Sequence, residues 1–143
     1  MTDAFETPVS PEELEIGDSG PEVVVEELER RDFVKYAGAS GDFNPIHYDE
    51  PYATEAGNPS VFAQGMLTAG FGAHMAADWF GLGNIMYYGV RFQARVFPDD
   101  TITVQGEITD IDRSGDETIV DADISAVNQD GDVVLTGSVT ASL

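Results

Sequence analysis

The stretch from residue 65 to residue 80 constrains the fold of this chain more than any other. Its residues predict a helix, and apolar side chains occur on every side of that helix: Met66, Leu67, Ala69, Phe71, Ala73, Met75, Ala76, Ala77, Trp79 and Phe80. A helix that is hydrophobic all round is a buried one, and this one is shorter than the roughly 20 residues that span a membrane. We therefore expect the rest of the protein to be wrapped around it.

Strand-like segments follow the helix over residues 84–97, 101–111, 118–128 and 133–143. In the second of these, Ile102, Val104, Gly106 and Ile108 share one parity, as in a half-buried strand. The links between the segments are short and rich in turn residues, which predicts antiparallel pairing.

Three shorter elements precede the helix. A strand is expected around Val23–Val25 and a helix over residues 27–39. A second short helix is expected over residues 49–56, with Asp49 as its N-cap and Pro51 in its first turn.

The simplest way to bury an apolar helix beside a run of antiparallel strands is to curl the sheet around it. The pattern therefore predicts an α+β protein with a hot-dog fold, an antiparallel β-sheet wrapped around one long buried helix. Another α+β layout with one long helix is the alternative. A chain of 143 residues fits one domain. We expect an irregular N-terminal arm over residues 1–20 and a single domain over residues 21–143.

The charge of the chain is strongly negative. It has 27 acidic and 6 basic residues, a formal net charge of -21. Such a field repels nucleic acid and anionic lipid, so neither is expected as a partner. The acids run along the whole chain and 42% of the residues are hydrophobic, which indicates a folded domain. We interpret the charge as adaptation to high salt, where the Debye length falls to about 3 Å. The alternative is an ordinary acidic protein.

Several classes of protein are excluded or disfavoured by what the sequence lacks. There is no cysteine, so disulfides, thiolate metal sites and cysteine nucleophiles are excluded. Residues 1–6 lack the basic and apolar regions of a signal peptide. These features predict a cytoplasmic protein without a membrane partner.

The densest polar cluster runs from Ser40 to His47, with the sequence SGDFNPIH. Asp42 and Asn44 are common loop formers, but the extended Asn44-Pro45 step also fixes His47 relative to Asp42. No Gly-x-Ser-x-Gly nucleophile turn is present, and one carboxylate with one imidazole makes too few ligands for a metal. The sequence therefore predicts a water held between Asp42 and His47, either of which can act as general acid or base.

Two further residues bear on this site. The first N–H groups of a helix have no internal partner and attract negative charge, so Gly65 N–H could stabilise the enolate oxygen that develops from a thioester carbonyl. The alternative is that Gly65 only allows close packing. The second histidine, His74, lies mid-helix among apolar residues and is interpreted as a core or interface histidine.

The segment with Tyr36, Ser40–His47 and Ala53 resembles the hydratase motif of MaoC-like dehydratases, which include the (R)-specific, type-2 enoyl-CoA hydratases. A Gly-Asp-x-Asn-Pro-aliphatic-His run is rarely met by chance. The resemblance continues through residues 59–66 and 91–100, and it covers roughly residues 20–143.

The resemblance implies a hot-dog fold, a homodimer or higher homo-oligomer, and reversible syn-hydration of trans-2-enoyl-CoA to (R)-3-hydroxyacyl-CoA. No cofactor is implied, because coenzyme A is part of the substrate, and no metal. Asp42 and His47 correspond to the catalytic pair and Gly65 N–H to the oxyanion donor. Asn44 and Ser40 correspond to residues that hold the loop. Beside these, we expect Phe62, Gln64, Met66 and Arg91 to contact substrate.

The chain departs from the family pattern at three places. Gln64 stands where the family often has histidine, and Gly72 or Ala73 stands where a polar residue is common. Both departures bear on substrate orientation and rate. The usual Pro-Gly-Asp turn is Pro98-Asp99-Asp100 here.

Some alternatives stay open at this stage. Arg91 and Arg95 are the one close pair of bases in the strand region, and we consider them candidates for contacts to the coenzyme A phosphates. An acyl-CoA thioesterase, or a non-catalytic acyl-thioester binding subunit, would use the same fold. The chemistry fits either physiological direction and any acyl chain length, and polyhydroxyalkanoate supply, fatty-acid oxidation and branched-acid metabolism could all use it. Substituted enoyl or dicarboxylic acyl-CoA substrates are also open.

Overall fold

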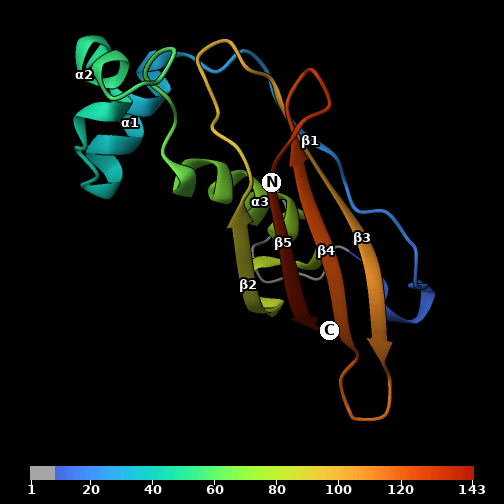
Figure 1. Cartoon of the computed structure of the whole chain (residues 1–143). Coiled ribbons are helices and arrows are strands. Elements are labelled where there is room, and N and C mark those ends of the chain that lie inside the picture. The colour runs from blue at the N-terminus through green and yellow to red at the C-terminus, as the bar shows by residue number, and fades with distance from the viewer. Residues whose placement is uncertain (1–8) are drawn as a thin grey trace.

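The computed structural model of the chain describes residues 9–143. Five strands form one antiparallel sheet in the order β1-β3-β4-β5-β2 (Figure 1). The strands are β1 (Val23–Val25), β2 (Ile85–Phe92), β3 (Ile102–Asp112), β4 (Ile119–Val127) and β5 (Val133–Ser142). The helices are α1 (Arg30–Ser40), α2 (Glu50–Glu55) and α3 (Gly65–Phe80), with short 3-10 turns at Pro11–Glu13, Pro45–His47 and Leu82–Asn84.

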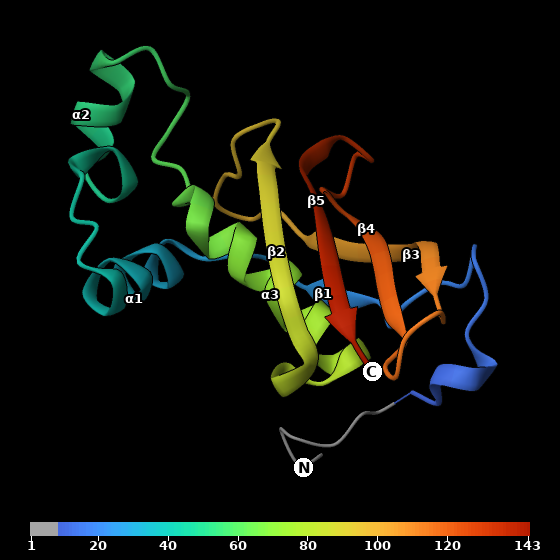
Figure 2. The same cartoon turned by 90° about the horizontal axis from the view of Figure 1, so that it is seen from below.

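Helix α3 lies against one face of the sheet, and α1 and α2 form a lobe beside its N-terminal end (Figures 1 and 2). This is the predicted hot-dog arrangement, and the bounds predicted for α3 are those observed. Helix α1 begins at Arg30 and not at residue 27, because Glu29 and Asp32 form a reciprocal capping box. Asp49 caps α2 as predicted, accepting a hydrogen bond from the Tyr52 amide.

The core forms where alternating residues of the sheet meet α3. The inward parity predicted for β3 is confirmed, since Ile102, Val104 and Ile108 are fully buried. Gly106, on the same parity, has a packing role: a Cβ there would lie 2.7 Å from the Trp79 ring. The glycine therefore lets α3 approach the middle of the sheet. Other core residues are Val120, Ala122, Ile124 and Ala126 of β4 and Met75 and Phe80 of α3.

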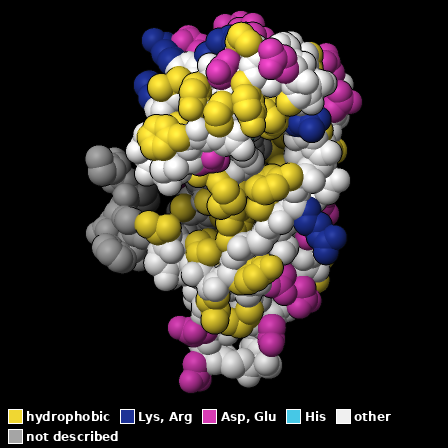
Figure 3. All heavy atoms as spheres, turned by 60° about the vertical axis from the view of Figure 1, so that its left-hand side comes forward, with side chains coloured by type: hydrophobic (Ala, Val, Ile, Leu, Met, Phe, Trp, Pro, Cys, Tyr) yellow, Lys and Arg dark blue, Asp and Glu magenta, His cyan; other side chains and the backbone are white. Residues whose placement is uncertain are grey.

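The prediction that α3 is buried on all sides is wrong for the single chain. Met66, Gly70, Ala73 and His74 are exposed on a stripe of the helix. The reason is geometric: one five-stranded sheet covers only the side of the helix that it faces. Figure 3 shows hydrophobic side chains gathered in the middle of one side of the molecule, with acidic side chains mostly around the margin.

The described part of the predicted N-terminal arm follows β3. Gly17 N–H donates to Ile108 O at 2.8 Å and Gly20 N–H to Gly106 O at 3.0 Å. Arg113 holds the start of this segment by donating to the carbonyl oxygens of Pro11 and Leu14. The part of the arm over residues 1–8 lies outside the described residues. Within residues 9–143, no helix has the length and apolar character needed to cross a membrane.

Candidate active site

The loop between α1 and α2 begins with a clamp made by Ser40. Its hydroxyl donates to Tyr36 O at 2.7 Å and accepts from the Asp42 amide at 3.1 Å. Between them, Gly41 ends α1 in the left-handed region, at a φ of 78°, which glycine adopts without steric cost. The Asp42 backbone is thereby fixed directly to the last turn of α1.

Asn44 organises the second half of the loop. Its side-chain oxygen accepts from the Ile46 amide at 3.1 Å and caps the short 3-10 turn that carries His47. Asp42 Oδ1 in turn accepts from the Asn44 amide at 3.3 Å. Both residues therefore form the loop as predicted, and the second carboxylate oxygen of Asp42 is left for other contacts.

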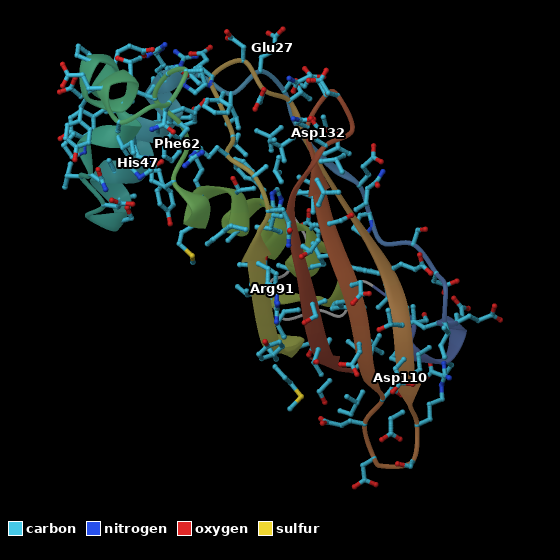
Figure 4. All side chains as sticks on the ribbon, in the orientation of Figure 1. Glu27, His47, Phe62, Arg91, Asp110 and Asp132 are labelled. Carbon is cyan, nitrogen blue, oxygen red and sulfur yellow. The ribbon has the colours of Figure 1, made fainter. Side chains whose placement is uncertain are left out.

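His47 is oriented by a carbonyl that lies outside the loop. Its Nδ1 lies 2.7 Å from Phe62 O, in the segment that leads into α3. A carbonyl oxygen can only accept, so Nδ1 carries the proton. In the neutral ring Nε2 then has a free lone pair. The His47 side chain is 10% exposed, and the Phe62 ring meets it edge-on at 5.4 Å (Figure 4).

The structure brings Asp42 and His47 together. Asp42 Oδ2 lies 3.5 Å from His47 Nε2. With Nδ1 protonated, both facing atoms are hydrogen-bond acceptors, so neither can satisfy the other while the ring is neutral. A water about 2.8 Å from each atom can lie beside the line that joins them and donate one proton to each. The Asp42 side chain is 46% exposed, so this position is open to solvent.

Gly65 begins α3 as predicted, and its N–H precedes the first internal hydrogen bond of the helix. The alternative role of this glycine, close packing, has direct support, because a Cβ at this position would lie 2.9 Å from the Phe92 ring. Its role as oxyanion donor stays a prediction. Phe62 lies three residues earlier and its carbonyl holds His47. One short segment therefore connects the imidazole to the start of α3.

The other residues expected to contact substrate occupy different environments. Phe62 packs on His47 and Met66 is 60% exposed at the first turn of α3. Gln64 is 1% exposed and donates to Phe33 O of α1 at 2.8 Å, so it joins two helices and does not face open space. Arg91 is not brought to the site: it lies on β2, well apart from His47 (Figure 4), and lines a groove on the sheet with Glu107.

Arg95 and His74 lie in environments that the sequence did not indicate. Arg95 lies over the Phe62 ring, with its guanidinium carbon 5.2 Å from the ring centroid, although its sequence position next to Arg91 gave no reason to separate the two. His74 is not a core residue: its side chain is 62% exposed and pairs with Asp78 at 3.1 Å. Whether His74 lies in an interface stays a prediction.

Comparison with known proteins gives the same fold and places the motif in a family. The model of the MaoC-like domain matches residues 12–129. A solved structure of a MaoC-like dehydratase superposes with a TM-score of 0.85 and 33% identity, covering 94% of this chain and 42% of that one. The unliganded R-hydratase PhaJ1 from Pseudomonas aeruginosa superposes with a TM-score of 0.80 and 27% identity, covering 91% of this chain and 82% of that one.

Two curated relatives are similar in sequence. The mitochondrial 3-hydroxyacyl-[acyl-carrier-protein] dehydratase FERN of Solanum lycopersicum is 26% identical over 78% of this chain and 68% of its own length. The 3-hydroxyacyl-thioester dehydratase Y of Mycobacterium tuberculosis is 32% identical over 68% of this chain. The match spans only 34% of that second protein's length.

Fold and site together define a hot-dog protein whose carboxylate and imidazole face each other beside the start of the central helix. The chain belongs to the MaoC-like domain family.

Proposed function

We propose that this protein hydrates trans-2-enoyl-CoA reversibly to (R)-3-hydroxyacyl-CoA. The observation that carries the proposal is the pair of acceptors, Asp42 Oδ2 and His47 Nε2, at 3.5 Å. A water has two protons, so a single water can satisfy both atoms at once. The names of the relatives, among them an R-hydratase and two 3-hydroxyacyl-thioester dehydratases, support the reaction class and the hand of the product.

In the proposed reaction the Asp42/His47 pair acts first as base and then as acid, and Gly65 N–H stabilises the charge that develops between the two steps. The bound water gives a proton to His47 Nε2 or Asp42, and its oxygen forms a bond to C3 of the enoyl group. The electron pair of the C2–C3 double bond moves to the thioester, whose carbonyl oxygen becomes an enolate. Gly65 N–H stabilises this oxygen at the start of α3. The pair then returns a proton to C2, and dehydration is the same path in reverse.

The hydrogen bond to Phe62 O explains how His47 can take part. Because Nδ1 is held as a donor, Nε2 is the atom that gains and loses the proton. The imidazolium formed in the reaction then faces the Asp42 carboxylate and is stabilised by it. The same carbonyl therefore fixes both the ring and its tautomer.

Variants of Asp42 and His47, with a variant of the other histidine as control, test the proposal. Asp42→Asn and His47→Gln should each lower the kcat for hydration of crotonyl-CoA by about 10²–10⁴-fold. His74→Gln is the control, since that histidine is exposed and lies away from the loop. Circular dichroism should show all three variants folded. Near-wild-type turnover in Asp42→Asn and His47→Gln would contradict the assignment.

The same assay separates the two alternative functions. A thioesterase would release free thiol from a saturated acyl-CoA, and a binding subunit would bind acyl-CoA without turnover. A thioesterase would direct the water held by the same pair to the thioester carbonyl instead of C3, so the product formed separates these two functions. A binding subunit would leave the paired acceptors without a role.

We further propose that the protein is a homo-oligomer, in the first instance a homodimer. Strand β2 lies at one edge of the sheet, and among the described strands it pairs only with β5, so no strand of residues 9–143 covers its other edge. Met86, Tyr87 and Phe92 of this strand are each more than half exposed. The exposed stripe of α3 belongs to the helix that is hydrogen-bonded to this strand. Light scattering should give twice the chain mass, and Met86→Asp should lower it. A monomeric wild-type protein would contradict the proposal.

The net charge supports one more proposal, that the protein works in a salt-rich cytoplasm. A charge of -21 on 143 residues gives strong self-repulsion in dilute buffer, and salt screens it.

A further inference from the structure

Half of the basic side chains already have partners in the structure. Arg30 pairs with Glu50 and Arg31 with Glu29, while Arg113 holds two carbonyl oxygens of the N-terminal segment. The other three bases, Lys35, Arg91 and Arg95, form no ion pair with a carboxylate of residues 9–143. In a chain with 27 acidic residues, a guanidinium without a carboxylate is unexpected.

Arg95 is the arginine of this group that lies beside the candidate active site. Its guanidinium carbon is 5.2 Å from the centre of the Phe62 ring, and the same ring meets His47 at 5.4 Å. Two ring contacts therefore separate the cation from the catalytic imidazole. Phe97 packs on Phe62 edge-on at 6.3 Å and keeps the ring in place.

The backbone on both sides of this contact is also fixed. Val96, the next residue, is 3% exposed, and its carbonyl accepts from the Ala63 amide at 2.8 Å. The segment that carries Arg95 is thus bonded to the segment that carries Phe62. The position of Arg95 near the site follows from this pairing of two chain segments.

The contact with Phe62 leaves the hydrogen-bonding edge of Arg95 free. An arginine that lies over an aromatic ring is attracted through its charge and its flat face. Its five N–H donors point outward in the plane of the group, in a fork that matches a carboxylate. Arg95 is exposed, so this fork is open to a ligand.

We propose that Arg95 is a specificity-determining residue that binds a carboxylate at the far end of the acyl group. The preferred substrates would then be trans-2-enoyl thioesters of dicarboxylic acids. This inference rests on the proposed hydration at Asp42 and His47. The coenzyme A phosphates fit the position less well, because the whole pantetheine arm separates them from the thioester, whereas Arg95 lies only two ring contacts from the imidazole.

The net charge makes a local cation more valuable for such a substrate. A surface with a charge of -21 repels a second carboxylate on the acyl group. A bidentate arginine–carboxylate pair offsets this repulsion at one position and not elsewhere. The acyl end that meets Arg95 is therefore selected by charge as well as by shape.

The test compares two acyl series on two arginine variants. One series consists of trans-2-enoyl-CoA thioesters that end in a carboxylate, and the other has a terminal methyl group at the same chain length. For at least one length, the wild-type protein should show a higher kcat/KM for the carboxylate. Arg95→Met should lower that value by about 10–100-fold, as for the loss of one charged hydrogen-bonded pair, and leave the methyl series within about twofold of wild type.

Arg91→Met is the matched control, because it removes the same charge from an exposed, unpaired arginine that lies away from His47. It should leave the ratio of kcat/KM between the carboxylate and methyl series unchanged. If Arg91→Met and Arg95→Met lowered kcat/KM for the carboxylate series equally, Arg95 would act only through its charge at a distance, and the inference would be overturned. A wild-type protein without preference for the carboxylate at any length would overturn it as well.

A change of carrier separates the two sources of negative charge. N-acetylcysteamine thioesters of the same acids have no phosphate, and the selective loss in Arg95→Met should persist with them. A loss of kcat/KM seen only with coenzyme A thioesters would show that Arg95 binds the phosphates, and would overturn the proposal that it binds the acyl carboxylate. If methyl-ended substrates are hydrated with no Arg95-dependent preference, only this inference fails. If no enoyl thioester is hydrated, the proposed function fails with it.

Discussion

At the scale of single residues, the site depends on what the Phe62 carbonyl does to His47. Without that hydrogen bond the neutral ring could carry its proton on either nitrogen. With it, Nε2 faces Asp42 as an acceptor at 3.5 Å. The chemistry of the pair is therefore set by an atom of the backbone, and not only by the two side chains.

Ser40 offers a prediction at this scale. Ser40→Ala removes both the bond to Tyr36 O and the acceptor for the Asp42 amide. We expect kcat to fall by about tenfold, which corresponds to ~1.4 kcal/mol in the barrier, with KM nearly unchanged, because the carboxylate loses its fixed position. Steady-state kinetics measure this split. Ser138→Ala, at the groove on the sheet, is the control. A rise in KM with kcat unchanged would show that Ser40 acts on binding instead.

The residues of the loop could be predicted from the sequence, and the residues that support it could not. Asp42, Asn44 and His47 lie within six positions, so their mutual placement follows from local turn chemistry. The contacts of Phe62 with His47 and Arg95 join positions 15 and more apart. They depend on how two segments pack, and hydrophobic periodicity carries no information about that. For the same reason Arg91 and Arg95 looked equivalent in the sequence but lie in different places.

At the scale of elements, a tyrosine joins the edge strand to the central helix. The Tyr88 hydroxyl of β2 donates to Ala69 O of α3 at 2.7 Å. Gly72 makes this approach possible, since a Cβ there would lie 2.3 Å from the same hydroxyl. The hydroxyl of a neighbouring strand thus fills the space beside Gly72, one of the two positions, Gly72 or Ala73, at which the resemblance implies a polar residue.

Burial of Tyr88 gives a prediction on alkaline stability. Partial burial of the Tyr88 side chain raises the pKa of its phenol from 10.0 to about 12. Between these values the folded protein keeps a proton that the unfolded chain has lost, so the contribution of Tyr88 to stability is complete below pH 10 and falls as the pH rises towards 12. Tyr88→Phe should cost about 0.5–1.5 kcal/mol at neutral pH.

Urea unfolding of wild type and Tyr88→Phe at a series of pH values measures this effect. The difference in unfolding free energy between the two proteins should shrink from pH 10 to pH 12. Tyr87→Phe serves as the control, because Tyr87 is 58% exposed. A difference that stays constant through this range would mean that Tyr88 titrates alike in both states.

Elements were predictable where one periodicity dominated. Strands β3 and β4 alternate cleanly, and their inward residues are those expected. The start of α1 was misplaced because the apolar stripe does not mark a helix end, whereas the capping box of Glu29 and Asp32 does. The exposed stripe of α3 was not predicted. An apolar helix indicates that its surface is covered, but its composition does not show whether one chain provides all of that cover.

At the scale of the whole molecule, charge and an open apolar face act together. Acidic side chains keep the surface hydrated, and they also repel one another. Three large apolar side chains are nevertheless exposed: Met66 in the first turn of α3, and Met86 and Phe92 on β2. Screening by salt lowers the repulsion and strengthens apolar contacts. Folding and assembly should therefore respond to salt in the same direction.

Thermal unfolding at increasing potassium chloride concentration tests this expectation. The melting temperature should rise up to molar salt, by about 4 °C for each kcal/mol of repulsion that is removed. Urea titrations at two salt concentrations would give the same trend in unfolding free energy. A melting temperature that is independent of salt, or that falls, would contradict the proposed adaptation to high salt.

The central claim, that Asp42 and His47 hold the water that adds to C3, is tested most directly by following the oxygen of that water. Trans-2-enoyl-CoA is incubated with the protein in oxygen-18 water and the products are examined by mass spectrometry. We predict one heavy oxygen at C3 of an intact 3-hydroxyacyl thioester, formed by wild type and lost in Asp42→Asn. Heavy oxygen in the carboxylate of a released acid, or the same labelled product from Asp42→Asn, would contradict the claim.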